Sequence, residues 1–196
     1  GYPTNHSIQI TNCLNNGEIN VTGVKNDVQI GGLIGNMTKN GYFNVEIKGS
    51  SNKATISAFS SPTTCIVGGL IGWVSRNGRS DLNISDCNNC KNLIASGIHN
   101  DVGGFVGSVS RNRLMNIKFE NDTNTGNVNV KTKNNDTNIG GIVGGVEENP
   151  SMEMTLNFVI NRGTMSTNYE SGDHDESIGI SGSCESESST SQNSER

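Results

Sequence analysis

Three basic residues recur at matching places in the chain and could bind an anionic ligand. Val74-Ser75-Arg76-Asn77 and Val109-Ser110-Arg111-Asn112 are near copies, and Thr38-Lys39-Asn40 stands at the corresponding place upstream. Stacked in register, Lys39, Arg76 and Arg111 would line one edge that suits an acidic polysaccharide or an acidic protein surface. The fourth copy, Glu147-Glu148-Asn149, reverses the sign. The competing interpretation is a set of solvated turns that recur because the chain repeats.

Trp73 is the single tryptophan of the chain, and it directly follows Gly72. Alternation along a strand could place its indole outward as a platform for a sugar ring, because the large aromatic face combines apolar area with a polar N–H. Capping of the core is the alternative. We group Trp73 with Lys39, Arg76 and Arg111 as the candidate ligand-binding edge.

Acidic residues form a second recurring pattern: Asn26-Asp27, Asn100-Asp101 and Asn135-Asp136. Asn and Asp are favoured in turns because their side chains bond to nearby backbone. Stacked carboxylates could instead bind calcium, which takes six to eight oxygen ligands, or supply the acid pair of a glycan-cleaving enzyme. One Asp per repeat is too few for either role. The sequence therefore predicts turn residues, and no catalytic residue, metal or cofactor.

The five cysteines are Cys13, Cys65, Cys87, Cys90 and Cys184. Cys87-x-x-Cys90 could be a redox pair or half of a zinc site, but no second Cys or His pair stands at a suitable spacing. Cys13 and Cys87 occupy equivalent places two repeats apart, so stacked strands would separate them by about 10 Å, too far for a disulfide. We expect partly buried thiols.

A glycine-framed phrase recurs four times, at spacings of 37, 35 and 37 residues, with a degenerate fifth copy at 178–182. Glycine in a strand marks close backbone approach, because no side chain intervenes. A phosphate cradle would need a following helix or Gly-Lys-Ser/Thr, and neither is visible. We therefore predict structural glycines. They are Gly31, Gly32, Gly35, Gly68, Gly69, Gly72, Gly103, Gly104, Gly107, Gly140, Gly141 and Gly144.

Short apolar alternations keep step with the glycine phrases, from Ile8-x-Ile10 through Val45-x-Ile47 to Leu156-x-Phe158. Alternation with period two indicates strands with one buried face. A fixed period of about 37 residues indicates a repeat architecture. The sequence predicts an all-β, right-handed parallel β-solenoid over residues 1–182, with a Ser/Glu-rich tail or linker over 183–196. Each unit would contain one turn with a long loop or two tight coils. An antiparallel β-sandwich is the alternative.

The glycine phrase, with its Asn-rich spacers, resembles the GLUG motif over about residues 8–182. GLUG repeats occur in large surface and secreted proteins, including IgA-specific metallopeptidases and adhesin-like proteins. The copies containing Leu33 and Leu70 match best, and those containing Phe105 and Ile142 depart from it. The resemblance implies a β-solenoid-like surface region. The His-Glu-x-x-His sequence of the peptidases is absent, so no peptidase activity carries over.

Composition narrows the classes of function. Net charge is −5, aromatic residues make up 5%, and no basic stripe with interleaved aromatics occurs, which argues against nucleic-acid binding. The longest apolar run, Cys65–Val74, is too short to span a bilayer. Six N-glycosylation sequons occur, no more than composition gives by chance, and they remain candidate sites for a chain in a secretory pathway. They are Asn5, Asn20, Asn36, Asn83, Asn121 and Asn135.

Three classes of function follow. The first is a non-catalytic, surface-exposed or secreted repeat module for adhesion or for binding a protein or glycan, as a fragment of a larger protein. The second is a structural or assembly scaffold, inside the cell, that associates through its solenoid edges. The third is a carbohydrate-active β-helix enzyme. The resemblance favours the first, with an extracellular or cell-surface location.

Overall fold

The computed structural model describes residues 6–39, 41–60, 62–169 and 176–178, without the side chains of 133–136, 169 and 176–178. Several sequence predictions fall outside these residues. They are the sequon at Asn5, residues Asn40 and Cys184, the part of the fifth glycine phrase after Ile178, and the tail 183–196. The side chain of the sequon residue Asn135 is also outside the described structure.

The described residues contain strands and no helix, and the paired strands run parallel. The first turn contains β1 (His6–Thr11), β2 (Leu14–Asn15), β3 (Ile19–Thr22), β4 (Val28–Gly31) and β5 (Ile34–Thr38). The second contains β6 (Tyr42–Lys48), β7 (Ser51–Asn52), β8 (Ile56–Phe59), β9 (Thr64–Gly68) and β10 (Ile71–Ser75). The third contains β11 (Arg79–Ser85), β12 (Asn88–Asn89), β13 (Leu93–Gly103) and β14 (Val106–Ser110). The fourth contains β15 (Leu114–Glu120), β16 (Thr123–Asn124), β17 (Val128–Gly140) and β18 (Val143–Glu147). A partial fifth turn contains β19 (Met152–Asn157), β20 (Ile160–Asn161), β21 (Met165–Tyr169) and β22 (Glu176–Ile178).

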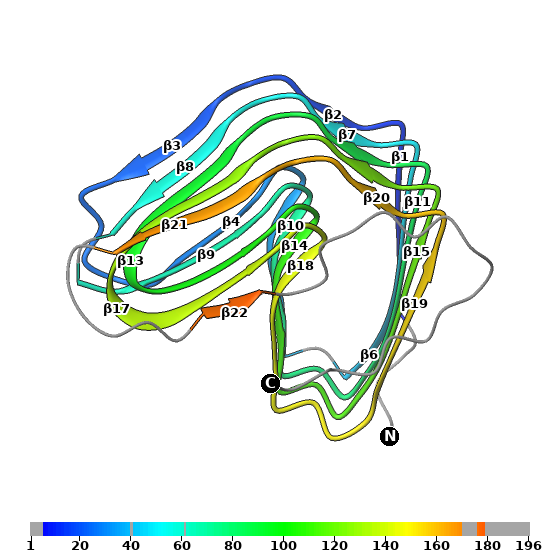
Figure 1. The fold of residues 1–196 in the computed structure, drawn as a ribbon. Helices are drawn as coiled ribbons and strands as arrows, with labels where there is room; N and C mark the ends of the chain where they lie inside the picture. The colour runs from blue at the N-terminus through cyan, green and yellow to red at the C-terminus, as the bar shows by residue number, and fades with distance from the viewer. Residues whose placement is uncertain (1–5, 40, 61, 170–175, 179–196) are drawn as a thin grey trace.

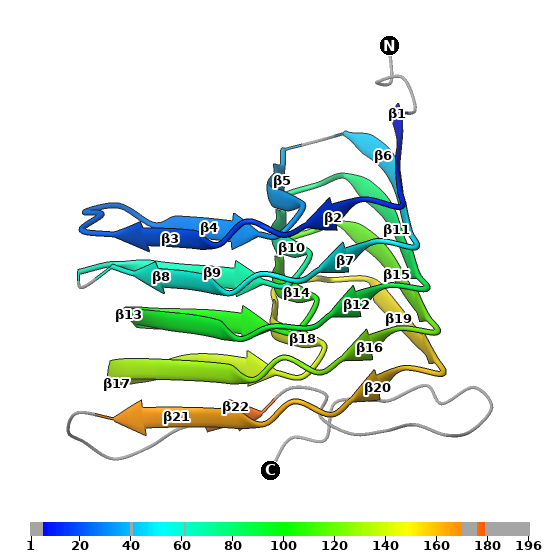
Figure 2. The ribbon, with the colours of Figure 1, turned by 90° about the horizontal axis from the view of Figure 1, so that it is seen from above.

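Corresponding strands of successive turns stack into sheets. Sheet A is β1-β6-β11-β15-β19, sheet B is β2-β7-β12-β16-β20, and sheet D is β5-β10-β14-β18. Sheet C holds an outgoing half, β3-β8-β13-β17-β21, and a returning half in which β4, β9 and β22 join the later parts of β13 and β17. The turns are right-handed, because the chain runs anticlockwise in Figure 1 while advancing toward the viewer (Figures 1 and 2). The predicted solenoid is confirmed, and the antiparallel sandwich is wrong.

Each unit makes one turn and does not form two tight coils. The extra residues of each unit form the strands of sheet C, which run out from the other sheets and back again (Figure 1). We call sheets A, B and D the stem and sheet C the arm. The stem encloses a hydrophobic core that includes Ile47, Leu82 and Phe119, whereas the arm encloses a second core that includes Ile56, Leu93 and Val128. The long unit is therefore stable because the outgoing and returning strands of the arm bury each other's apolar faces.

The repeated glycines lie where the arm rejoins the stem. A Cβ on the first glycine of each phrase, such as Gly68, would overlap the carbonyl oxygen of the residue three positions later, here Ile71. A Cβ on the second, such as Gly69, would overlap the carbonyl of Gly104 and meet Asn89 at 2.7 Å. The phrase is therefore a corner of touching backbones, as the sequence predicts in general terms.

The asparagine that meets this corner belongs to a ladder that crosses all five turns. Each amide nitrogen donates to the amide oxygen of the next turn at 2.8 Å, and the central members are fully buried. The members are Asn15, Asn52, Asn89, Asn124 and Asn161. A buried amide needs such partners, because an unpaired polar group inside a protein is costly.

Replacing Asn89 by Ala is expected to lower the free energy of unfolding by about 2 kcal/mol, because it breaks two buried ladder bonds at once. Asn15→Ala breaks one ladder bond and one exposed bond from the N–H of Gly17 in the first turn, where water can replace the lost partners, and should cost less than half as much. Urea unfolding of both variants measures the difference. Equal losses would show that the ladder bonds do not determine stability here.

Candidate functional site

Lys39, Arg76 and Arg111 lie in one column on the stem, directly after β5, β10 and β14. All three are exposed. The backbone N–H of Lys39 donates to the carbonyl of Ser75 at 3.2 Å, and that of Arg76 donates to Ser110 at 3.2 Å. These bonds fix the three residues one turn apart, about 4.8 Å between neighbours. We call the column the basic edge.

The fourth member of the column, Glu148, partly neutralises it. Arg111 Nε donates to Glu148 Oε2 at 2.7 Å, and this hydrogen bond together with the opposite charge raises the pKa of Arg111. Within the described residues, no ion pair involves Lys39 or Arg76. The cationic character of the edge is thus concentrated at Lys39 and Arg76.

The backbone of the basic edge is left-handed, with φ of 60° at Lys39, 56° at Arg76 and 58° at Arg111. Left-handed backbone favours Gly, Asn and Asp. A second left-handed column, between sheets A and B, contains mostly such residues: Asn12, Gly49, Asp86, Asn121 and Phe158. The basic edge instead holds long cations at strained positions, stacked beside like charges. Strain of this kind points to a functional role.

Trp73 lies on the outer face of sheet D, two residues before Ser75, and is partly exposed. Its neighbours Ile71 and Val74 are fully buried in the stem core. The indole Nε1 donates to Ser110 Oγ at 2.9 Å, which fixes the ring across two turns. Trp73 therefore points outward, and part of its ring is exposed on β10, the strand that Arg76 follows.

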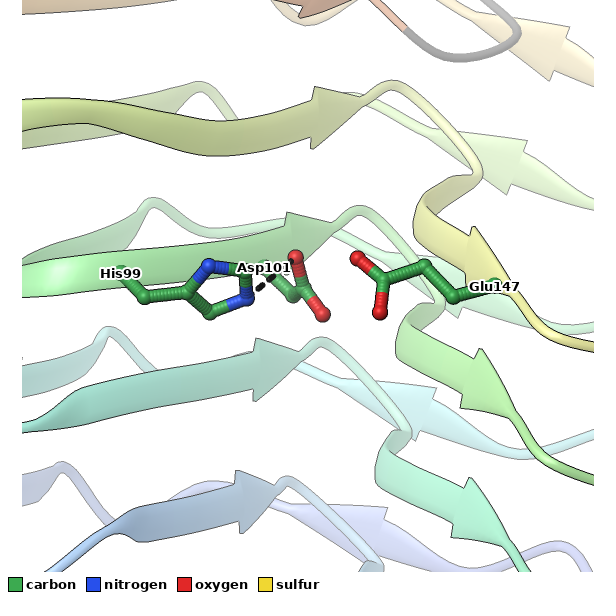
Figure 3. A group of neighbouring side chains, drawn as sticks. All are labelled: His99, Asp101 and Glu147. Carbon is green, nitrogen blue, oxygen red and sulfur yellow. Dashed lines mark ion pairs between the residues drawn. The ribbon is translucent and has the colours of Figure 1, made fainter.

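A second cluster lies in the corner between the returning half of the arm and sheet D (Figure 3). His99 and Asp101 are two residues apart on β13 and therefore share one face of the strand. Glu147 approaches from the end of β18, on the next turn of the stem (Figure 3). His99 Nε2 lies 3.2 Å from Asp101 Oδ1, and one donor atom from each of the three side chains lies within 4.8 Å of the others.

This arrangement corrects the predicted stack of Asp27, Asp101 and Asp136. Asp27 Oδ1 accepts from the backbone N–H of Thr64 at 3.3 Å, and Thr64 pairs with His99, which pairs with Asp136. Asp101 pairs instead with Ile66 and Asn138. The three positions are not equivalent in register because Asp101 precedes its glycine phrase by two residues, and the other two by four.

The described cysteines are free thiols. Burial raises the pKa of Cys65, and it raises the pKa of Cys87 to about 11, so both are protonated and unreactive at neutral pH. Cys13, Ser50 and Cys87 stack in one column through bonds from backbone N–H groups to the next side chain. Among the described residues, Cys13 is an exposed free thiol and Cys90 is a partly buried one.

Four sequon asparagines lie on the described surface and are exposed: Asn20 on β3, Asn36 on β5, Asn83 on β11, and Asn121 in the turn after β15. Asn36 lies near the corner, where its Nδ2 donates to Gln29 Oε1 at 3.4 Å. Asn83 lies on the outer face of sheet A, beside a shallow polar hollow of about 430 Å³. This hollow is lined by Asn44, Asp81, Asn83, Asn116, Ile117, Lys118, Glu153 and Thr155.

No protein-family model matches the chain, and no curated protein or solved structure is detectably similar to it. Across the residues that the structure describes, no helix is long and apolar enough to cross a membrane.

Sequence reasoning grouped the basic edge but missed the corner cluster. The pattern His99-x-Asp101 is visible as two polar residues on one face of a predicted strand. Glu147 lies 46 residues beyond Asp101 and meets it only because the arm folds back beside the stem. The asparagine ladder was also missed, although its members recur at intervals of 37 or 35 residues.

Proposed function

We propose that the protein is a non-catalytic repeat module that binds an anionic ligand, an acidic glycan or an acidic protein surface, through its basic edge. The observation that carries the proposal is the stacking of Lys39, Arg76 and Arg111 at left-handed backbone positions. Like charges on adjacent parallel strands repel, and a bound polyanion would relieve that repulsion. Trp73, fixed by Ser110 on the same sheet, would supply an aromatic face beside the charges.

The proposed ligand class follows from the stacking of the basic residues. Basic residues whose backbones stack about 4.8 Å apart in one column suit a linear polymer that carries a negative group on each unit. We therefore propose that the protein acts in adhesion, at a cell surface or after secretion. This role agrees with binding to a polyanion and with the resemblance to GLUG-repeat proteins. In this context the exposed sequons at Asn20, Asn36, Asn83 and Asn121 are candidate glycosylation sites.

The double variant Lys39→Ser/Arg76→Ser is expected to weaken binding to a sulfated or uronic-acid polysaccharide about tenfold at low salt, because two charge-assisted contacts are lost. Isothermal titration with a heparin-type and a polyuronate chain measures the change. The control Lys53→Ser/Lys91→Ser removes the same charge from exposed positions elsewhere and should leave affinity unchanged. Equal loss in both double variants, or none in the first, would contradict the proposal.

A structural scaffold is the second candidate, and a different observation favours it. The ends of the described stack expose apolar side chains, with Ile8 47% and Leu14 50% exposed in the first turn and Phe158 61% exposed near the last. In the described residues β1 is an edge strand of sheet A, and unpaired edges invite axial association. Concentration-dependent association in sedimentation velocity without ligand, together with absent polyanion binding, would favour the scaffold.

A further inference from the structure

We propose that His99, Asp101 and Glu147 form a binding site for a first-row divalent transition-metal ion, of which Zn²⁺ is the best-fitting example. The proposal goes beyond ligand binding at the basic edge and departs from the sequence prediction of no metal. Its starting point is the convergence of one imidazole nitrogen and two carboxylate groups from two elements and two turns (Figure 3).

The donor geometry fits a tetrahedral site. Zinc binds His nitrogen and carboxylate oxygen at 2.0–2.2 Å, so two donors at a tetrahedral angle lie about 3.3 Å apart. His99 Nε2 and Asp101 Oδ1 are separated by 3.2 Å. Glu147 is exposed, and rotation of its side chain can bring a carboxylate oxygen from within 4.8 Å to the same distance. Water would occupy the fourth position.

The donor set also selects the class of metal. Imidazole combined with carboxylate suits zinc and its first-row neighbours, whereas calcium requires six to eight oxygen ligands. A single His with two carboxylates offers too few oxygens for calcium. The net charge of a neutral imidazole and two carboxylates balances a divalent ion.

The corner is shaped around the buried carboxylate. Asp101 is 2% exposed, although it lies on the outward face of the returning arm. A Cβ on Gly145 of β18 would lie 2.7–2.8 Å from the carboxylate atoms of Asp101, so any larger residue there would push this carboxylate out of its present position. The equivalent positions in the other turns hold Asn36, Trp73 and Ser108. The cluster therefore occupies a space made by a local departure from the repeat.

A neighbouring amide holds the carboxylate in place. Asn138 Nδ2 donates to Asp101 Oδ1 at 2.8 Å and lies 3.4 Å from Glu147 Oε1. Removing a group that orients a metal ligand in this way typically weakens metal binding by about 10- to 100-fold. A bound ion would join β13 of the arm to β18 of the stem, across the third and fourth turns.

The test is titration of the untagged full chain with Zn²⁺, after alkylation of its accessible thiols with iodoacetamide. Cys65 and Cys87 are buried and protonated, so they do not compete for the metal. We expect one saturable site per chain, with affinity reduced about 100-fold or more by His99→Ala or Glu147→Gln. Zn²⁺ should also raise the melting temperature of the unsubstituted chain but not of Glu147→Gln, because only the native site binds the ion preferentially in the folded state.

Two matched controls separate this site from general metal binding. His6→Ala removes an exposed histidine, and Glu18→Gln removes an exposed glutamate of the first turn; neither should change the affinity. Glu147 is exposed, so its substitution leaves the fold intact and keeps the test decisive even if changes at buried Asp101 unfold the chain. Absent saturable binding, or equal losses for His6→Ala and His99→Ala, would overturn the proposal.

Discussion

Replacing Gly72 by Ala is expected to remove about 3 kcal/mol or more from the free energy of unfolding. A Cβ at Gly72 would overlap the carbonyl oxygen of Gly35 and lie 2.8 Å from the carbonyl oxygen of Ile30. Both obstacles are backbone atoms of the preceding turn, so no side chain can rotate away. The two turns would have to separate, which breaks ladder bonds and opens the corner where the arm meets the stem.

Gly35 is the matched control, because it holds the same place in the phrase one turn earlier. A Cβ there would meet the carbonyl oxygen of Gln29 at 3.2 Å, with no closer atom among the described residues. Gly35→Ala should change stability by less than about 1 kcal/mol, since reduced freedom of the unfolded chain offsets the mild crowding. Urea denaturation compares the variants. Similar losses at both positions would mean that backbone conformation, rather than contact between turns, requires these glycines.

The second large effect is a pH dependence that arises from Asp122. Burial raises the pKa of Asp122 to about 7, even though its oxygens accept hydrogen bonds from the backbone N–H groups of Cys87 at 2.8 Å and Glu120 at 3.0 Å. Because the folded pKa lies above the unfolded value, the folded state binds more protons between these pKa values. The free energy of unfolding that depends on this carboxyl is therefore highest below about pH 4. It falls as pH rises from about 4 through 7, by about 4 kcal/mol in total.

Asp122→Ser should flatten this part of the stability curve between pH 4 and pH 8. The same column already contains serine at Ser50, whose Oγ accepts from the N–H of Cys13 at 3.1 Å and donates to the carbonyl of Lys48 at 3.1 Å. Urea unfolding at several pH values measures the slope of the free energy of unfolding against pH. A loss of stability that is the same at every pH does not change this slope. Asp27→Ser, at an exposed carboxylate on the arm, should retain the original slope. An unchanged slope in Asp122→Ser would show that the folded protein keeps this carboxylate ionised.

The sequence predicted the stacking well, because stacking follows from local periods. Alternation at Val45-x-Ile47, Leu82-x-Ile84 and Ile117-x-Phe119 specifies a strand with one buried face, and the period of about 37 residues sets the register from turn to turn. The prediction for Leu156-x-Phe158 was wrong, because Leu156 pairs with Phe119 and Phe158 lies after the strand, 61% exposed. The arm was not predicted, because its core forms only when outgoing residues such as Leu93 meet returning residues such as Val102 across the same turn. Short apolar runs do not indicate which of their neighbours they will face.

The candidate sites differ in the same way. Lys39, Arg76 and Arg111 each follow their glycine phrase by a similar distance, so repetition alone suggested that they share an edge. The corner cluster depends on a departure from repetition. Asp101 lies two residues closer to its phrase than Asp27 does, and Gly145 replaces the larger side chains found at equivalent positions. Such departures become meaningful only when the arm and stem are seen side by side.

The hydrogen bonds between turns have a mechanical consequence. They run along the solenoid axis, so tension applied along that axis would load every bond of one interface together, while the successive interfaces would carry the load in series. A chain of this kind yields first at its weakest interface. Under axial tension the described stack would therefore release whole turns at that interface, and each released turn would act as an extensible tether while the remaining turns keep their shape.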